Sequence, residues 1–261
     1  MKRKILKYSF SGHDKFDCKI DWLSSAVNYD RPLMVNDETI MHLGLGSNMI
    51  KSLKHWIKVF ELENFKELLR KKDPFFESLE TLWILHFNLV KNATLYYLFF
   101  NKMNLYKFGK DEIFGFVQDF IGKNGLRVSE NTVKNDIDVF FRIYGGLFRE
   151  LNLIKKHEGF YKLNIKGKNR ISDKLFLYFL ADFMEKRGLK DSVSLFTLQN
   201  DDFSLQKSLV MSENVFMRRL YRLENISGGI FVYKESATLR EIYIMKDFDK
   251  NEFLEDVYDE I

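Results

Sequence analysis

The chain has very little cysteine, and this excludes two common ways of stabilising a fold. Cys18 is the single cysteine among 261 residues. An intrachain disulfide is therefore impossible, and a zinc site built from pairs of cysteines is excluded as well. Because a fold without disulfides is typical of a reducing compartment, we expect a cytoplasmic protein.

Long apolar segments are also missing. The longest apolar stretches, residues 81–90 and 175–184, contain polar groups and are about half as long as the roughly 20 residues that a membrane span needs. Ser9, His13 and Asp14 follow the basic start of the chain, where a signal peptide would have its apolar core. We therefore expect neither a membrane span nor a secretory signal.

Proline is rare, and the motifs of common enzyme classes are absent. The sequence has 2 prolines and no linker rich in serine or proline, which favours helices. It contains no GxxxxGK[ST] loop, no GxGxxG after a strand and no GxSxG elbow. Gly44 and Gly46 are interpreted as a turn between helices, so no motif specifies an enzyme.

The residues that are present indicate a folded, slightly basic protein. Hydrophobic residues make up 46% and charged residues 30%, which is enough apolar material for a core. The net charge of +4 is compatible with binding a polyanion. Residues 247–261 carry seven acids. We expect this acidic tail to be a solvated end, and the alternatives are a dock for a partner or a flap that competes with nucleic acid.

Three segments share the order helix, tight turn, amphipathic helix, and two of them continue into a predicted β-hairpin. We therefore predict a mainly α fold with small β-hairpin wings, built from tandem winged-helix and helix-turn-helix units. The expected domains are an N-terminal helical domain with the first helix-turn-helix (1–104), a central winged helix (105–170) and a C-terminal winged helix with the acidic tail (171–261). Such units bind DNA in many proteins, and in others they are scaffolding.

The first helix-turn-helix covers residues 36–63. A short helix is predicted to end at Gly44, and Ser47 is predicted to cap a second helix. Apolar residues at helical spacing form its buried stripe: Met49, Ile50, Leu53, Trp56, Ile57 and Phe60. The opposite face lacks acids, and its candidate DNA-binding residues are Ser47, Asn48, Lys51, Lys54 and Lys58. A merely solvated face is the alternative.

The second segment covers residues 110–163. A helix over 111–121 leads through a glycine turn to a helix capped by Ser129, and a strand pair follows with its turn at Glu158 and Gly159. The exposed face of the second helix is predicted to be mixed, with three acids that oppose phosphate: Glu130, Asp136 and Asp138. We expect this helix to serve packing or protein contact more than DNA reading. Its candidate DNA contacts are Asn131 and Arg142.

The third segment covers residues 203–245. A short helix, a turn at Met211 and a second helix precede a long β-hairpin. Phe216, Leu220 and Leu223 are predicted to point inward. Three arginines are predicted to cluster on the other side as DNA contacts: Arg218, Arg219 and Arg222.

The stretch SFSGHDKF near the N-terminus gathers polar residues in a glycine-containing turn. Its His13 and Asp14 can supply a general base or a metal ligand, and they are the candidate catalytic residues. The alternative is that both residues cap a helix over 17–29 and bond to its backbone.

Three acids before an apolar helix are explained structurally: Asp73, Glu77 and Glu80. Asp73 is predicted as an N-cap with Pro74 at the first helical position. The alternative is a Mg²⁺ site for phosphodiester cleavage, which requires the ligands to converge in space. His86 on the apolar helix is expected to be a hydrogen-bonded core histidine.

Several of these pieces together resemble the prokaryotic family known as domain of unknown function 4007. They lie in the family's order between residues 10 and 144: FSGHDKF, Trp22-Leu23, LGLGSNMIKSLKHW, DPFFESLETLWILH, YYLFFN and VSENTVKNDIDVFFRIY. Where Asp14 stands, members of the family more often carry glutamate.

The resemblance implies a DNA-binding component of a bacterial DNA phosphorothioation or anti-phage defence system, because this family is similar to the SspB-type nicking subunit of single-strand phosphorothioation. Such a subunit nicks one DNA strand so that sulfur can replace a non-bridging phosphate oxygen. The implied partners are DNA, a cysteine desulfurase and an ATP-dependent sulfurtransferase, and the implied cofactor is Mg²⁺ or Mn²⁺. The alternatives are a non-enzymatic winged-helix regulator, in which Asn48, Asn131 or Arg219 reads bases, and an adaptor for the sulfur-transfer enzymes.

Overall fold

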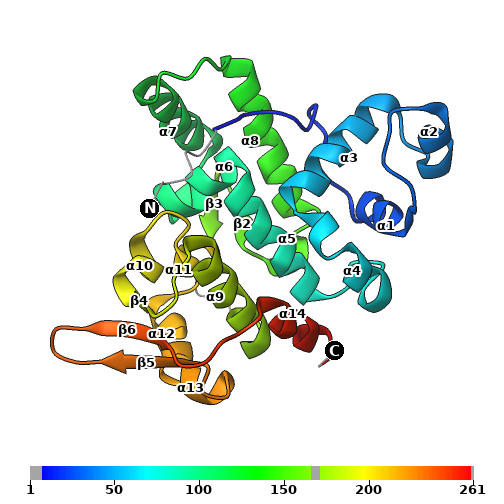
Figure 1. The fold of residues 1–261 in the computed structure, drawn as a ribbon. Helices are drawn as coiled ribbons and strands as arrows, with labels where there is room; N and C mark the ends of the chain where they lie inside the picture. Colours follow the sequence, from blue (N-terminus) through cyan, green and yellow to red (C-terminus); the bar gives the residue numbers. More distant parts are fainter. Residues whose placement is uncertain (1–7, 166–170, 260–261) are drawn as a thin grey trace. The chain divides into compact units, whose positions relative to one another are not determined.

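The computed structural model describes residues 8–165 and 171–259, which form two compact units (Figure 1). The N-terminal unit ends at Asn164 and the C-terminal unit begins at Ile165. The boundary expected after residue 104 lies inside the N-terminal unit. The reason is a shared core, in which Tyr96 and Phe140 from either side of that boundary pack with their ring centroids 5.4 Å apart.

The N-terminal unit consists of short helices followed by a small sheet. Its helices and strands in chain order are α1 (Ile20–Asn28), α2 (Asp37–Leu43), α3 (Ser47–Val59), η1 (Leu62–Asn64), α4 (Lys66–Lys72), α5 (Leu79–Asn92), α6 (Thr94–Tyr97), η2 (Leu98–Lys102), β1 (Lys107–Phe108), α7 (Lys110–Lys123), α8 (Glu130–Gly145), η3 (Arg149–Leu151), β2 (Ile154–His157) and β3 (Phe160–Leu163).

The predicted first helix-turn-helix is confirmed as α2, a turn and α3. Asn36 caps α2 by accepting a hydrogen bond from the Thr39 N–H, and Gly44 ends it in the left-handed conformation (φ 64°). The predicted capping by Ser47 is wrong, since Gly46 is the N-cap and no side chain bonds the free N–H groups there. The predicted stripe of α3 is buried at Ile50, Leu53, Trp56, Ile57 and Phe60, and only Met49 is half-buried.

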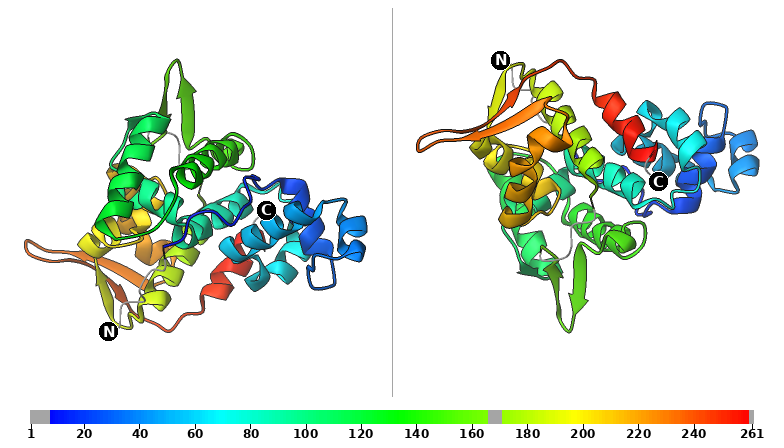
Figure 2. Two further views of the ribbon diagram at one scale, coloured as in Figure 1. Left: turned by 90° about the horizontal axis from the view of Figure 1, so that it is seen from above. Right: turned by 90° about the horizontal axis from the view of Figure 1, so that it is seen from below.

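The first sheet is antiparallel, with strand order β1-β3-β2. The hairpin β2–β3 was predicted, and its turn lies at Glu158 and Gly159. Ser129 caps α8 by accepting a hydrogen bond from the Thr132 N–H, as predicted. Strand β1 was not predicted because it has only two residues, too few for an alternating pattern. Figure 2 shows the hairpin projecting beyond α7 and α8.

The C-terminal unit repeats this plan. Its described helices and strands in chain order are α9 (Asp173–Arg187), β4 (Ser192–Ser194), α10 (Leu195–Asn200), α11 (Leu205–Ser208), α12 (Glu213–Tyr221), α13 (Leu223–Ile226), β5 (Phe231–Glu235), β6 (Arg240–Ile244) and α14 (Lys250–Asp259). Its sheet has strand order β4-β6-β5, and in both units a short strand before the helix pair joins the later hairpin.

Residues 250–259 of the acidic tail form a packed helix and not the expected solvated end, and residues 260–261 lie outside the described residues. Helix α14 packs against α9. Four of its side chains are buried: Phe253, Leu254, Val257 and Tyr258. Lys250 at its start lies 3.2 Å from Asp182 and 2.9 Å from Glu185 of α9. The acids occupy the outer face of an amphipathic helix, and the apolar residues between them decide where it lies.

The expected role of Asp73 is also corrected. Asp73 follows α4 and does not cap α5, whose N-cap is Ser78. The buried Asp73 carboxylate accepts hydrogen bonds from the N–H groups of Glu77 and Ser78 and from the hydroxyl of Thr81 (2.6–3.2 Å). It therefore holds the turn between the two helices.

His86 is a buried core histidine, as predicted, with its Nδ1 2.9 Å from the hydroxyl of Tyr144. Among the described residues, no helix combines the length and apolar character needed to cross a bilayer.

Candidate functional site

The segment that contains SFSGHDKF crosses the N-terminal unit without regular secondary structure and is held by side chains from other elements. The Ser9 N–H donates to the Thr94 hydroxyl (2.9 Å), and the Trp56 indole donates to the Phe16 carbonyl (3.1 Å). The Arg142 guanidinium donates to the Lys15 carbonyl (2.6 Å). These contacts fix the path of a segment that forms no ladder of its own.

Gly12 is required at its position in this segment. Its φ of 109° lies in the region that favours glycine. A Cβ built on Gly12 would lie 2.5 Å from Nδ1 of His55. The turn can therefore pass close to α3 only without a side chain at this position.

His13 forms a pair with Asp136 of α8. Its Nε2 lies 3.0 Å from Oδ1 of Asp136, and both side chains are buried. The same carboxylate accepts the Ser11 N–H at 2.9 Å (Oδ2) and 3.2 Å (Oδ1). Because an ionised carboxylate only accepts, Nε2 carries the proton, and in a neutral imidazole Nδ1 is then an acceptor. Within the described structure, Nδ1 of His13 is buried and has no hydrogen-bond partner.

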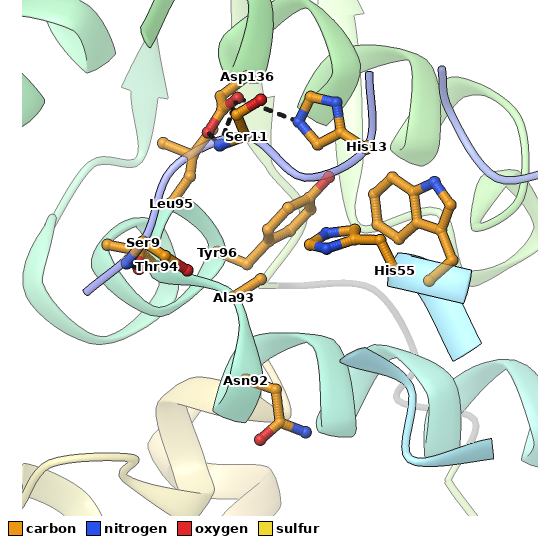
Figure 3. A pocket seen from close by; sticks show the side chains of 11 residues that line it. Ser9, Ser11, His13, His55, Asn92, Ala93, Thr94, Leu95, Tyr96 and Asp136 are labelled. Carbon is orange, nitrogen blue, oxygen red and sulfur yellow. Dashed lines mark hydrogen bonds and ion pairs between the residues drawn. The ribbon is translucent and has the colours of Figure 1, made fainter. Parts of the chain in front are cut away.

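Next to the His13–Asp136 pair is a small cavity of about 30 Å³, room for one or two water molecules (Figure 3). It is lined by Ser9, Ser11, His13, His55, Trp56, Asn92, Ala93, Thr94, Leu95, Tyr96 and Asp136. The exposed Ser9 and Ser11 stand at its edge, whereas Tyr96 is buried and its hydroxyl has no partner among the described residues. Burial, and then the nearby Asp136 carboxylate, raise the pKa of Tyr96 well above its usual value.

His55 of α3 keeps a neutral ring in this cavity. Burial lowers the pKa of His55 to about 4, and its ring centroid lies 6.0 Å from that of His13. Trp56 stacks on His13 with ring centroids 5.7 Å apart and separates it from the core. The cavity thus holds two imidazoles, a phenol and a carboxylate in partly apolar surroundings.

The structure separates the two residues that the sequence grouped as catalytic. His13 lies in the cavity, whereas Asp14 is exposed and does not line it. The alternative, that both residues cap a helix over 17–29, is wrong, because α1 begins at Ile20 and Lys19 is its N-cap, without a side-chain bond.

Asp136 was missed as a functional residue and assigned to an exposed face that opposes phosphate. It is instead 6% exposed. The available signal was its place on α8 directly beside the buried stripe, between Val133 and Ile137. An acid inside an apolar stripe needs a buried partner, but the sequence does not say which one.

The lysine face of α3 is a second candidate site. Five residues of this face are exposed, as predicted: Ser47, Asn48, Lys51, Lys54 and Lys58. Within the described part of the chain none of the three lysines forms an ion pair, and α3 has no acid in its first turn. The face therefore presents unneutralised positive charge along about two helical turns.

Helices α8 and α12 present less free charge. On α8, Asn131 is exposed, whereas the Arg142 guanidinium donates to the Asp17 carboxylate (3.0 Å). Burial raises the pKa of Asp17, but hydrogen bonds from the Lys19 and Arg142 side chains outweigh that effect and lower it. On α12, Arg218 is exposed. Arg219 is not, since it bonds the Ser172 carbonyl and Asp173 at the start of α9. The predicted cluster of three outward arginines is therefore wrong for this residue.

Arg222 remains exposed after α12 and lies 3.1 Å from Asp173. Arg219 and Arg222 thus both bond Asp173 at the start of α9, which reduces the charge left for a ligand.

The order of these elements and motifs is that of a known family. The family model described as "Protein of unknown function (DUF4007)" matches residues 10–258. The chain belongs to the DUF4007 family. The match includes the His13 turn, the lysine face of α3 and both units.

Two solved structures have the same fold as this DUF4007 chain. A magnesium ion-bound SspB crystal structure superposes with a TM-score of 0.84 at 20% sequence identity, covering 96% of this chain and 88% of that chain. A second SspB crystal structure gives a TM-score of 0.81 at the same identity and coverage. A search of curated proteins finds no match.

The residues around the cavity do not fit a resident Mg²⁺ ion. Magnesium favours octahedral oxygen ligands, but both oxygens of Asp136 already accept hydrogen bonds from His13 and Ser11. Among the described residues, no group of three or more histidine, cysteine or acidic side chains is placed to hold a metal. The predicted alternative of a metal site at Asp73, Glu77 and Glu80 is not supported either.

Proposed function

We propose that this protein is the DNA-binding subunit of a DNA phosphorothioation system of the anti-phage type. The observation that carries the proposal is the lysine face of α3, which offers Lys51, Lys54 and Lys58 to the phosphate backbone. Three lysines on one helix face with no acid among them are unusual for a solvated surface, where signs normally mix. DNA phosphates would supply the missing negative charge.

The fold supports the same conclusion. In each unit a helix and a short strand precede further helices and a hairpin, which is the order of a winged helix. Such units place one helix in a groove of DNA in many proteins. The likeness to SspB structures and membership of the DUF4007 family agree with a place in a phosphorothioation system.

The test removes the charge of the α3 face from the full chain. A triple variant with Lys51→Gln, Lys54→Gln and Lys58→Gln is compared with a control with Lys110→Gln, Lys123→Gln and Lys134→Gln. The control lysines already have carboxylate partners at 2.6, 2.6 and 3.5 Å. Both triple variants lose the same net charge, and duplex affinity is measured by fluorescence anisotropy over a range of salt concentrations.

We expect the α3 variant to bind at least about tenfold more weakly at low salt, with the slope of log K against log salt reduced by roughly 0.9 for each lost phosphate contact. The control should behave as the unchanged protein. Equal affinity of the α3 variant and the control would refute the α3 site.

A second candidate function, strand nicking, is favoured by the free Nδ1 of His13. We infer that His13, oriented by Asp136, takes a proton from the water that attacks the phosphorus, while the P–O bond to one sugar oxygen breaks and that leaving oxygen is protonated from solvent. A carboxylate behind a histidine fixes the tautomer and stabilises the imidazolium that forms. His13 lines a cavity that has room for that water, and exposed serines stand at its edge.

Nicking is tested on supercoiled plasmid with Mg²⁺, Mn²⁺ or EDTA. The variant His13→Gln keeps a donor for Asp136 but has no base, and His42→Gln on α2 is the matched exposed control. We expect relaxed circles with the unchanged protein and the control and none with His13→Gln. Salt-sensitive binding without any nicking would instead favour a regulator or an adaptor, and a preference for a palindrome would favour the regulator.

The proposed partners are a cysteine desulfurase and an ATP-dependent sulfurtransferase. Neighbouring genes for both enzymes and their co-purification with the tagged full chain would support this assignment. Co-purification of neither enzyme from the native host would argue against it.

A further inference from the structure

Three lysines stand side by side across the first sheet. Lys107 of β1 is the cross-strand partner of Lys162 of β3, and Lys162 is the partner of Lys155 of β2. Residues directly opposite each other in an antiparallel sheet project to the same face. The register therefore aligns the three side chains in one row, called here the lysine row.

The lysine row is on the outer face of the sheet. The alternate residues Phe108 and Tyr161 point to the opposite face, where their rings lie 6.4 and 4.1 Å from Phe141 of α8 between centroids. Phe108 is fully buried there. Since neighbouring residues of a strand alternate between faces, the lysines point away from α8.

Two ring side chains lie on the same outer face and hold the row together. Phe160 of β3 stacks with His157 of β2 at a centroid distance of 5.1 Å. The ammonium groups of Lys107 and Lys162 lie 4.0 and 5.4 Å from the Phe160 ring centroid. The aromatic face thus gathers two ammonium groups that would otherwise repel each other.

This arrangement is costly without an anion. Like charges that are direct cross-strand partners destabilise a sheet. Within the described residues, none of the three lysines has a carboxylate partner, and the nearest acid along the hairpin is Glu158 in the exposed turn. An anionic ligand would offset the repulsion.

We propose that the lysine row binds consecutive phosphates of a DNA backbone, as a second DNA contact besides α3. Strands in a sheet are about 4.8 Å apart, so three partners span about 10 Å. Each strand of B-DNA carries a phosphate at every nucleotide, so a row of this length can follow consecutive phosphates of one strand. The hairpin projects beyond the helices α7 and α8 (Figure 2), and Lys107 and Lys155 are exposed while Lys162 is half-buried.

The inference rests on the proposed function for the choice of DNA among polyanions, and it gives sequence-independent positioning, not base reading. A further triple variant with Lys107→Gln, Lys155→Gln and Lys162→Gln is compared with the control triple at Lys110, Lys123 and Lys134. Anisotropy is measured with non-specific duplex DNA and, separately, with a polyaspartate peptide.

We expect the row variant to bind duplex DNA at least about tenfold more weakly at low salt, with a salt slope reduced by roughly 2 to 3. Its melting temperature should equal or exceed that of the unchanged protein, since a repulsion has been removed. If the triple variant melts early, Lys162→Gln alone replaces it, with an expected slope change of about 1.

The outcomes separate this inference from the proposed function. If the row variant binds DNA like the control while the α3 variant is weakened, the lysine row is not a DNA site and the proposed function stands. If only the row variant is weakened, the inference stands and the α3 site is wrong. Loss of polyaspartate binding with unchanged DNA binding would assign the row to an acidic protein and overturn the inference.

Discussion

The His13–Asp136 pair joins two segments that are 123 positions apart in the numbering (136 − 13). The Asp136 carboxylate accepts hydrogen bonds from a backbone N–H and from an imidazole at once, and this explains why a buried acid is tolerated on α8. The pair therefore both supports the N-terminal turn and leaves Nδ1 of His13 available. A structural and a chemical role are compatible at this residue.

Gly12→Ala is expected to lower the free energy of unfolding by about 2 kcal/mol or more, because a side chain at this φ is strained and would meet His55. Urea unfolding measures the change. The control Gly115→Ala lies exposed within α7 with open space around it, and it should raise stability by about 0.5–1 kcal/mol. The same sign for both substitutions would contradict the geometry.

Acid should weaken the fold through His55. The pKa of His55 is lowered to about 4 in the folded protein, whereas its ordinary value is 6.5. As the pH falls below 6.5, His55 is therefore protonated in the unfolded chain before it is protonated in the folded protein. The contribution of His55 to the free energy of unfolding is therefore fully present above pH 6.5, and it is lost as the pH falls towards 4. We expect a loss of about 2 kcal/mol from this residue between pH 7 and pH 5.

The measurement compares urea unfolding of the unchanged protein and His55→Gln at both pH values. Glutamine does not titrate, so the variant should lose about 2 kcal/mol less on acidification. An identical pH dependence would mean that His55 is protonated equally well in the folded protein.

At the scale of elements, α14 shows how an acidic segment becomes part of a core. Leu254→Ala on its buried face should cost about 2–4 kcal/mol, because a cavity would form against α9. Glu255→Ala on the exposed face should change stability by less than about 0.5 kcal/mol. Urea unfolding of both variants measures these changes. Equally small effects would mean that α14 does not pack on α9 and is a solvated tail.

The lysine row predicts a second effect on an element. Lys162 faces two like charges, so Lys162→Gln should raise the free energy of unfolding by roughly 0.4–2 kcal/mol in the absence of DNA. The gain should shrink in high salt, which screens the repulsion. A destabilised variant at low salt would show that Lys162 contributes packing and not repulsion.

At the scale of the whole molecule, the sheets of the two units share one strand order. Each hairpin acquires its third strand from a segment of two or three residues that precedes the helix pair. Such short strands form only because the edge of a partner strand is present, so the local sequence does not predict them. The predicted plan of helices and wings was therefore correct in outline but lacked one strand in each sheet.

The sequence by itself determined the features that depend on hydrophobic periodicity and on the residues that begin or end a helix or a turn. The helix stripe of α3, the Ser129 cap, the Gly44 terminus and the two hairpins follow from local rules that act within a few residues. Exposure of the α3 lysines followed from the same helical spacing.

Only the tertiary structure decided which distant side chains meet. It brought Asp136 to His13, turned Arg219 inward to α9, buried one face of the acidic tail, and set Lys107 beside Lys162. Each of these contacts depends on strand register or helix packing between segments far apart in the sequence. The periodicity of one segment gives the face on which a residue lies, but carries no information about what that face will contact.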